Sequence, residues 1–473
     1  RSDRRSLVNY YFSRYYSMLN MSLVARHVSS NSARASSGCD ILIVGGGLVG
    51  NAVAASIDFF SGLNPQLRGQ KVVVIDSAKS KPVLPSKGSP YSNRVSAVSP
   101  ASVSLFRDLG VWNQLEKYRV KRVNKLHVIE SSSRAEITFD RPGNAEVAFI
   151  VENDAIVGVL SDLLSTLSNV THRTAACVES CQLPDSTRDL AIVTVRSGES
   201  FSAQLVIGAD GANSMVRECA SMDTTCWSYS QSAVVATVRV SADGGNETAW
   251  QRFSPLGPIA LLPLTSELSS LVWTTSPDEA KRICSLSADS FVDELNEALL
   301  TTAHQNSITN QALFAIDSTF SYMRSSVRAS SVPPHILSLE RDNRASFPLG
   351  FSNSQTYIAP RVALLGDAAH RVHPLAGQGV NMGWRDVVIL TRVLEKALKS
   401  GADIGSLSSL RRYDSLAQQY NVPTMVAIDW LNRIYRTQST PIVLARSIGL
   451  SAFNSLLPLK DFLVHSLSQH PKV

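Results

Sequence analysis

Apolar and polar positions predict strands and helices in turn near the start of the chain's main body. Asp40–Val44 is a short apolar run, a glycine cluster follows it, and Val49–Phe60 has the pattern of a helix. Lys71–Ile75 is a second buried-strand run, and it ends at Asp76. A strand, a helix and a second strand predict a βαβ unit, which requires a parallel sheet covered by helices.

The middle of the chain has a different pattern. Between about residues 232 and 275, short runs rich in β-branched or aromatic residues are separated by Gly, Pro and Ser. These runs are Ser232–Val240, Thr248–Phe253, Pro258–Pro263 and Ser269–Thr275. They predict an antiparallel sheet.

After the middle region the pattern returns to a buried strand and then to helices. Arg361–Leu365 is the strand, and Asn381–Lys399 has apolar residues at helical spacing. From Ser406 onward the chain is mostly helical, with apolar residues (Ile428, Leu431, Ile434, Tyr435) predicted on one face and polar residues (Asp429, Asn432, Arg433, Arg436) on the opposite one. Packing against the rest of the chain and contact with a membrane surface are two alternatives for these helices.

Composition narrows the class of protein. The chain has 473 residues, enough for two or three domains, and its 44% hydrophobic and 18% charged residues exclude a disordered or collagen-like chain. The charge-free stretch Ile41–Ile57 contains four glycines, which makes it a poor membrane span. Six cysteines form no CxxC pair, which argues against both a zinc site and a disulfide scaffold.

The net charge of +6 is concentrated in the first 38 residues. This segment has six arginines, one acidic residue, no lysine and ten serines, so it contributes +5 and leaves +1 for the rest. A nucleic-acid groove is not needed to explain this balance, and no nucleic-acid partner is expected. An Arg- and Ser-rich, acid-poor start is typical of a mitochondrial transit peptide, with a disordered tail as the alternative.

A glycine motif follows the first predicted strand. Residues 45–50 (GGGLVG) fit GxGxxG, in which the glycines permit a tight turn, close approach of a pyrophosphate, and close helix–strand packing. Asp76 lies 26 residues beyond Gly50, at the end of the next strand, where a carboxylate accepts hydrogen bonds from an adenosine ribose. These features predict dinucleotide binding, with an ordinary glycine turn as the alternative.

Two later motifs decide between NAD and FAD. The predicted strand at 361–365 runs into GDAAH (366–370), and HPLAGQGVN (373–381) follows; LVIGADG (205–211) lies earlier, before Ser214 and Arg217. A carboxylate at a strand end can bind flavin ribityl hydroxyls, and a helix N-terminus can direct amides at the isoalloxazine edge. Together the three motifs resemble those of the flavoprotein aromatic hydroxylases, including their GD box and DG motif, which implies FAD.

Further segments are similar to the ubiquinone-biosynthesis branch of these hydroxylases. They are SNRVSA (92–97), FRDLGVW (106–112), WQRF (250–253), GPIALLPL (257–264) and LVW (271–273), and the run at 366–383 resembles the mitochondrial branch closely. The similarity covers about residues 38–465. It implies that Arg94 contacts the flavin and that Glu152 or Asn153 lies near the flavin ring. Asp76 stands where this branch usually has Glu.

The motifs and the resemblance together give a set of expected FAD-binding residues. They are Gly45, Gly47, Leu48, Val49, Gly50, Asp76, Arg94, Glu152, Asp210, Gly366, Asp367, Pro374, Gly377, Gln378, Gly379, Val380 and Asn381.

The resemblance also implies an activity. It implies an FAD-dependent monooxygenase that hydroxylates the ring of a polyprenylated 4-hydroxybenzoate-type intermediate in coenzyme Q biosynthesis, at C5, with a second ring hydroxylation by the same protein left open. O2 would react with reduced FAD to form a C4a-hydroperoxide that attacks the phenol ring. Electrons would come from ferredoxin and ferredoxin reductase. A related monooxygenase that uses NAD(P)H directly, and a non-catalytic flavin-fold carrier, are the alternatives.

The resemblance further implies a location and partners. The protein is expected on the matrix side of the mitochondrial inner membrane, in peripheral contact with it and within the coenzyme Q biosynthetic complex.

Candidate substrate residues are less well defined, and the sequence identifies no catalytic side chain. Trp250, Arg252 and Trp273 on the predicted sheet are candidates for the substrate pocket, with ordinary sheet packing as the alternative, and His370 is a fourth candidate. His370 and His373 have HxxH spacing, but no third ligand is evident, so no metal site is predicted.

The predicted fold is α/β, with a Rossmann-like FAD-binding domain, an interleaved antiparallel-sheet substrate domain and C-terminal helices. The expected boundaries are a leader at 1–38, the FAD-binding domain in two parts at 39–220 and 346–400, the substrate domain at 221–345, and a helical region at 401–473.

Overall fold

The computed structural model describes residues 37–63, 69–131, 135–140, 146–184, 189–241, 245–300 and 332–455. The predicted leader up to residue 36, and the part of the predicted C-terminal region from residue 456 onward, lie outside the described residues.

A parallel sheet forms the cofactor side of the molecule. Five parallel strands pair in the order β19 (Val362–Leu364), β11 (Ser200–Gly208), β1 (Ser37–Val44), β2 (Val72–Ile75) and β8 (Val170–Arg173). The short antiparallel strands β18 (Ile358–Ala359), β9 (Val178–Gln182) and β10 (Ala191–Val195) extend it. All four residues of β2 are buried, as expected for a parallel strand covered on both faces. The predicted βαβ unit is confirmed, with α2 (Leu48–Leu63) as its helix.

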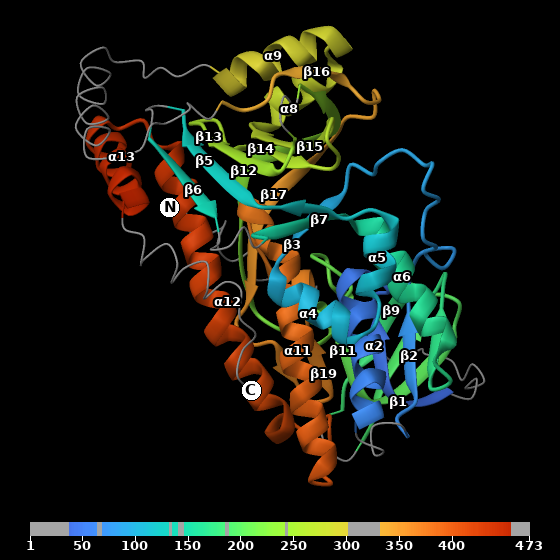
Figure 1. The fold of residues 1–473 in the computed structure, drawn as a ribbon. Coiled ribbons are helices and arrows are strands. Elements are labelled where there is room, and N and C mark those ends of the chain that lie inside the picture. Colours follow the sequence, from blue (N-terminus) through green and yellow to red (C-terminus); the bar gives the residue numbers. More distant parts are fainter. Residues whose placement is uncertain are drawn as a thin grey trace, which may run out of the picture.

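A larger, mainly antiparallel sheet lies above the parallel one in Figure 1. Its nine strands are β20 (His370–Arg371), β17 (Ala345–Ser354), β12 (Thr224–Val240), β15 (Leu268–Thr275), β14 (Ile259–Pro263), β13 (Thr248–Phe253), β5 (Lys125–Glu130), β6 (Glu136–Asp140) and β16 (Ile336–Leu339). The pairing of β13 with β5 is parallel. The sheet therefore draws strands from both parts of the expected FAD-binding segment, and its membership does not follow the expected boundaries at 220 and 345.

The two faces of the large sheet are covered differently. Helices α8 (Pro277–Ser285) and α9 (Ala288–Leu300) cover what we call the outer face, where Phe291 and Leu295 pack against Val234 and Leu271. The opposite, inner face packs against α11 (Gln378–Lys399) and α12 (Leu407–Arg436). Its buried apolar cluster consists of Val128, Ile137, Tyr229, Ala233, Phe253, Leu349, Phe351, Val372, Leu375, Met382, Met425, Ile428 and Tyr435.

A third, three-stranded sheet lies between the two. Strand β7 (Ala148–Glu152) pairs with β3 (Val95–Val98) on one side and β4 (Lys121–Val123) on the other. Helix α6 (Asn153–Thr166) leads from β7 to β8 of the parallel sheet, and α4 (Pro100–Asp108) and α5 (Trp112–Tyr118) lie between β3 and β4 in the chain.

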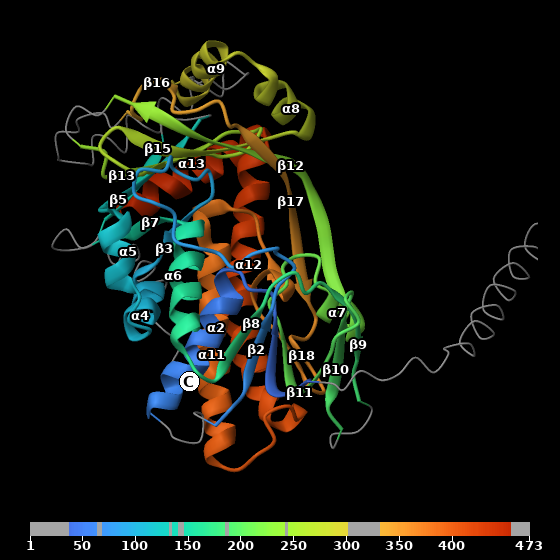
Figure 2. The same cartoon turned by 90° about the vertical axis from the view of Figure 1, so that its right-hand side faces the viewer.

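The C-terminal helices run along the whole molecule. With 30 residues, α12 is about 45 Å long at 1.5 Å per residue, and it lies against α11 in both views (Figures 1 and 2). Helix α13 (Thr440–Ser455) follows and packs on β6. None of the helices in the described part of the chain is both long and apolar enough to cross a bilayer.

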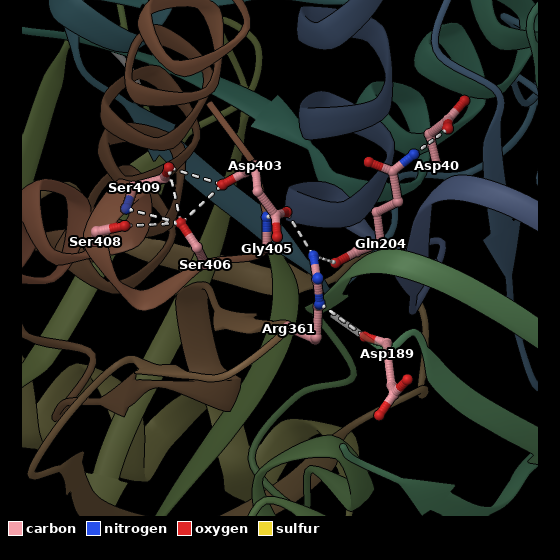
Figure 3. Close-up of polar contacts among 9 residues, drawn as sticks. All are labelled: Asp40, Asp189, Gln204, Arg361, Asp403, Gly405, Ser406, Ser408 and Ser409. Atoms are coloured by element: carbon pink, nitrogen blue, oxygen red, sulfur yellow. Dashed lines mark hydrogen bonds and ion pairs between the residues drawn. The ribbon is translucent and has the colours of Figure 1, made fainter. Parts of the chain in front are cut away.

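A buried arginine fastens the start of the C-terminal helices to the parallel sheet (Figure 3). Arg361 has a φ of 66° and is 4% exposed. Its guanidinium donates to the carbonyls of Asp189 (3.0 Å) and Gln204 (3.2 Å), and it pairs with Asp403 at 2.5 Å. Through Arg361 the loop before α12 is thereby tied to two segments that lie 172 and 157 residues before that arginine.

Candidate active site

Three predicted motifs meet at the carboxyl ends of adjacent parallel strands. The amide of Ala209 donates to Val44 O at 2.8 Å, and the amide of Leu365 donates to Gly208 O at 2.9 Å. The glycine loop, the DG motif and the GD box therefore follow neighbouring strands β1, β11 and β19. Ligands of open α/β sheets bind at this edge, where the strand order reverses.

The glycine loop is shaped for close backbone approach. Gly45 has a φ of 104°, in the left-handed region that favours glycine. A Cβ on Gly50 would lie 1.8 Å from Gly45 O, so any side chain there would force the loop apart. A Cβ on Gly47, in contrast, meets no described atom within 4 Å, so this position faces open space beside the first turn of α2. The free amides at that helix N-terminus form a site for phosphates.

Asp76 is held rigidly at the end of β2. Its Oδ2 accepts from the amide of Gly46 at 2.5 Å and its Oδ1 from the amide of Ala78 at 2.6 Å. His172, on β8, lies beside Gly46, and burial lowers the pKa of His172. Because each carboxylate oxygen can accept a further bond, Asp76 retains capacity for ribose hydroxyls. The sequence analysis missed His172, which no motif marks.

The GD box is tied to the interior by a buried carboxylate. Asp386 on α11 is 0% exposed. Its Oδ2 accepts from the amide of Gly366 at 3.0 Å and contacts His370 Nε2 at 2.6 Å. Its Oδ1 accepts from Asn421 Nδ2 at 2.8 Å. Asp367 is exposed, although desolvation by the surrounding protein raises the pKa of its carboxyl group. The arrangement holds the Asp367 backbone still while its carboxylate stays accessible to a ligand.

Asn381 has a structural role that the sequence did not show. Its Oδ1 accepts from the amide of Ser99 (2.9 Å) and from Ser102 Oγ (2.8 Å), and its Nδ2 donates to the carbonyls of Ala97 (2.8 Å) and Gly377 (3.0 Å). All four hydrogen-bonding positions of the side chain are used. A cofactor contact at Asn381 is thus left to the main chain, while the side chain fixes the start of α11 against β3.

Glu152 and Arg94 occupy different environments. Glu152, 3% exposed, accepts from the amide of Ser92 (2.8 Å) and pairs with Arg119 (3.4 Å). Arg119 also donates to the carbonyls of Lys87 and Ser89. Glu152 therefore holds the 87–92 loop in place, whereas the Arg94 side chain is exposed. Of the two, Arg94 has the freedom to contact a flavin.

Arg217 joins the DG motif to the GD box. It donates to the carbonyls of Ala368 and Ala212, both at 2.7 Å. Asp210 accepts from the amide of Val216 at 3.3 Å through its Oδ2. The two motifs, far apart in sequence, are thus one unit in the structure.

These residues fit FAD. The open space at Gly47 beside the first turn of α2 leaves room for a pyrophosphate, Asp76 has acceptor capacity for a ribose, and the exposed Asp367 carboxylate could accept hydrogen bonds from a ribityl chain. The remaining expected contacts from Pro374 to Val380 lie in the segment that opens α11.

Comparison with known proteins agrees with this geometry. Residues 38–322 and 322–419 match the model of an FAD binding domain family. A Caenorhabditis elegans protein named ubiquinone biosynthesis monooxygenase COQ6, mitochondrial, is 48% identical over 441 residues, covering 92% of this chain and 97% of the relative. The human protein of the same name is 39% identical, covering 89% and 91%. The chain belongs to the COQ6 family of ubiquinone biosynthesis monooxygenases.

Solved structures show the fold of this family more widely. The p-nitrophenol 4-monooxygenase PnpA from Pseudomonas putida superposes with a TM-score of 0.65 at 19% identity, covering 92% of this chain and all of that one. A variant of HpxO from Klebsiella pneumoniae, complexed with FAD, gives a TM-score of 0.64 at 15% identity, covering 92% and 99%. The family model and the COQ6 relatives confirm the FAD cofactor and the monooxygenase activity, and the solved structures confirm the predicted fold class.

In this COQ6-family chain, the candidate substrate residues lie away from the inner face. Trp273 packs on the outer face with Phe291 of α9, at a centroid distance of 6.0 Å, and Trp250 lies against the same cluster. Arg252, two residues further along β13, points to the same side as Trp250, because side chains alternate along a strand. His370 is bound to Asp386. These positions favour the packing alternative over a substrate pocket.

The face predicted for α12 is partly wrong. Leu431 is 44% exposed, whereas Asp429 and Asn432 are buried at 9% and 2%. Asn432 donates to Gln231 Oε1 at 3.2 Å, and Asp429 lies near Tyr229, so the helix turns these polar groups toward β12. Hydrophobic periodicity missed this because the buried partners are themselves polar.

Proposed function

We propose that the protein hydroxylates the ring of a polyprenylated 4-hydroxybenzoate-type intermediate, at C5, in coenzyme Q biosynthesis. The observation that carries the proposal is the apolar inner face beside the flavin motifs. Val372 and Leu375, from the loop that follows the GD box, pack in one cluster with Phe253 and Leu349 of the large sheet. An aromatic ring with an isoprenoid substituent matches this surface chemically.

The residues of the chain have separate tasks in this reaction. Bound FAD supplies the activation of O2. Asp386 and Asn381 hold the loop at 366–377 in one position relative to the sheet. The apolar cluster excludes water and orients the ring, since a preorganised dry site favours reaction over side reactions.

Product analysis tests the proposal. The purified holoenzyme is supplied with reductant, O2 and 4-hydroxybenzoate carrying a short prenyl group at C3, and the products are identified by mass spectrometry and NMR. A catechol with the new hydroxyl at C5 supports the proposal. A product changed only on the prenyl chain, or hydroxylation at another ring carbon, contradicts it.

We propose further that ferredoxin, reduced by its reductase, supplies the electrons. The support is the similarity of the chain to the mitochondrial ubiquinone-biosynthesis hydroxylases. Anaerobic bleaching of the flavin absorbance by reduced ferredoxin, with slow bleaching by NADPH alone, is the expected result. Rapid bleaching by NADPH would instead assign the protein to the hydroxylases that use NAD(P)H directly.

We also propose peripheral contact with the matrix side of the inner membrane, within a coenzyme Q biosynthetic complex. Three large apolar side chains on α12 are exposed: Val426 (48%), Trp430 (60%) and Leu431 (44%). Arg433 and Arg436, in the last turn of the same helix, add positive charge suited to anionic lipid. The same helix packs through Met425 and Ile428 on the inner face, so a lipid-borne substrate would arrive next to the site.

Vesicle binding tests the membrane proposal. We expect the protein to sediment with vesicles of phosphatidylcholine and cardiolipin, and the double variant Trp430→Glu, Leu431→Glu to bind at least tenfold more weakly, since each apolar side chain loses its burial in lipid. Leu300→Glu, another exposed apolar position (55%), on α9, serves as the control. Equal binding by the double variant and the wild type would place the contact elsewhere.

A further inference from the structure

A strip of polar groups interrupts the apolar inner face. Tyr229 of β12, His373 of the loop before α11, and Asp429 and Asn432 of α12 are all at most 9% exposed. They lie next to side chains such as Phe253 and Met425, in the cluster that includes Tyr229. Buried polar groups normally occur with hydrogen-bond partners, so each member of this strip requires an explanation.

Three members of the strip, Tyr229, Asp429 and Asn432, have polar partners or neighbours. Asn432 donates to Gln231. Asp429 accepts from Arg433 at 2.6 Å and lies near the Tyr229 hydroxyl, and burial followed by this carboxylate raises the pKa of Tyr229. These contacts join β12 to α12.

His373 differs from the rest of the strip. It is 0% exposed, and neither of its ring nitrogens has a hydrogen-bond partner among the described residues. Its ring stands edge-on to that of Tyr229, with centroids 5.3 Å apart. Pro374 follows it directly in the loop between the GD box and α11, so the imidazole lies at the junction of the flavin segment and the large sheet.

The sheet is distorted where it meets His373. The register between β12 and β17 shifts between Ser228 and Gln231, and Ser230 has a φ of 51°. Such bulges redirect a side chain and are frequent beside active sites. Here the bulge turns Tyr229 inward, to 5% exposure.

We propose that His373, with Tyr229 beside it, receives the phenolic hydroxyl of the substrate. The inference rests on the proposed ring hydroxylation and adds the residues that recognise the ring oxygen. The hydroxyl donates a hydrogen bond to one imidazole nitrogen.

The electrostatics of the site suit this role. Burial lowers the pKa of His373 to about 4, with Arg436 acting in the same direction and Asp429 opposing it. The imidazole is therefore neutral at physiological pH, with one donor and one acceptor nitrogen. An acceptor that draws the phenolic proton toward itself raises electron density on the ring carbons ortho and para to the oxygen. Those are the carbons at which an electrophilic oxygen is added.

A ligand pair isolates this interaction. The holoenzyme is titrated with 4-hydroxy-3-prenylbenzoate and with 3-prenylbenzoate, which lacks the hydroxyl, and binding is followed by the flavin difference spectrum. We expect the wild type to prefer the phenol by about 5- to 10-fold, the effect of one hydrogen bond to a buried group. His373→Leu should bind both ligands equally. His373→Gln, which keeps an acceptor, should recover part of the preference, and Tyr229→Phe should reduce it.

Tyr118→Phe is the matched control. Tyr118 is also a buried tyrosine (8% exposed) whose hydroxyl has no hydrogen-bond partner among the described residues, but it lies on α5 in the cofactor-side core. This variant should keep the wild-type preference.

The outcomes are distinguishable from those of the product analysis. Equal affinity of the wild type for the two ligands overturns the inference. A full preference for the phenol in His373→Leu overturns it as well, and so does a full preference in both His373→Gln and Tyr229→Phe. A wild type that prefers the phenol through His373 but forms no ring-hydroxylated product contradicts the proposed function and leaves the recognition of the hydroxyl in place.

Discussion

In the segment that opens α11, Asn381 and Asp386 use both of their polar side-chain atoms in hydrogen bonds, whereas on the inner face of the large sheet His373 has no hydrogen-bond partner among the described residues. Asn381 makes four hydrogen bonds and Asp386 has three partners. His373, which precedes both of them in the same segment, has none among the described residues. A side chain that is already satisfied positions the backbone, and one that is not can recognise a ligand. The difference separates the framework of this enzyme from its recognition surface.

The largest expected effect comes from breaking the framework at the glycine loop. Gly50→Val should abolish FAD binding, because even its Cβ would lie 1.8 Å from Gly45 O. The measurement is the ratio of flavin to protein absorbance in the purified protein, followed by titration with FAD. Gly449→Ala, a helical glycine on α13 with open space around it, is the control and should bind FAD normally. Wild-type flavin content in Gly50→Val would show that the loop adapts.

The next effect concerns the buried carboxylate. Asp386→Ala should lower the free energy of unfolding by about 3–5 kcal/mol, since removing one partner of a buried pair leaves His370 and the Gly366 amide uncompensated. Urea unfolding measures this difference. Glu395→Ala on the same helix removes a surface pair with Lys399 and should cost at most about 1 kcal/mol. Similar losses in both variants would mean that the buried cluster is not part of the framework.

A smaller effect is expected on the pH dependence of stability, and it comes from His373 on the inner face. The pKa of His373 is about 4 in the folded protein against an ordinary 6.5, so the unfolded chain takes up the proton first. Stability from this group is complete above pH 6.5 and is lost as the pH falls toward 4, by about 2 kcal/mol between pH 7 and 5.

His373→Leu removes this contribution. The variant should show a drop in unfolding free energy between pH 7 and 5 that is smaller than the wild-type drop by about 2 kcal/mol. Urea unfolding at the two pH values, with Tyr118→Phe as the control, makes the measurement. An unchanged pH dependence would mean that the imidazole is solvated.

The smallest effect is expected on the outer face. Trp250→Phe should change KM for the prenylated phenol by no more than about twofold, because surface and packing substitutions away from a ligand have small effects. Steady-state kinetics with the same substrate, compared with Tyr229→Phe, measures the contrast. A tenfold rise in KM for Trp250→Phe would return this tryptophan to the substrate pocket.

The glycine loop, Asp76 and the GD box could be predicted from sequence because each requires an unusual residue at a fixed place after a strand. Many strands and helices could also be predicted, because apolar runs such as VVVI at 72–75 are typical of buried strands. The recognition surface could not be predicted in this way. Tyr229 and His373 become neighbours through a bulge and a loop, and the local sequence around each residue does not predict the contact.

The exposure of Trp430 could not be predicted from the sequence for a different reason. A helix is expected to bury its apolar stripe, but α12 buries Asp429 and Asn432, whose partners lie about 200 residues earlier. Periodicity reports what a helix would do alone, and long-range polar pairing overrides it here.

The interleaving of the two sheets also determines when the protein can complete its fold during synthesis. Strand β11 is made long before its parallel neighbour β19 (Val362–Leu364), and β12 waits for β17 (Ala345–Ser354). Until the ribosome has passed the GD box, both sheets keep an open edge at which another chain could pair. A chain that stops near residue 345 is therefore two unfinished sheets, and the segment that completes the flavin site is the same one that closes them.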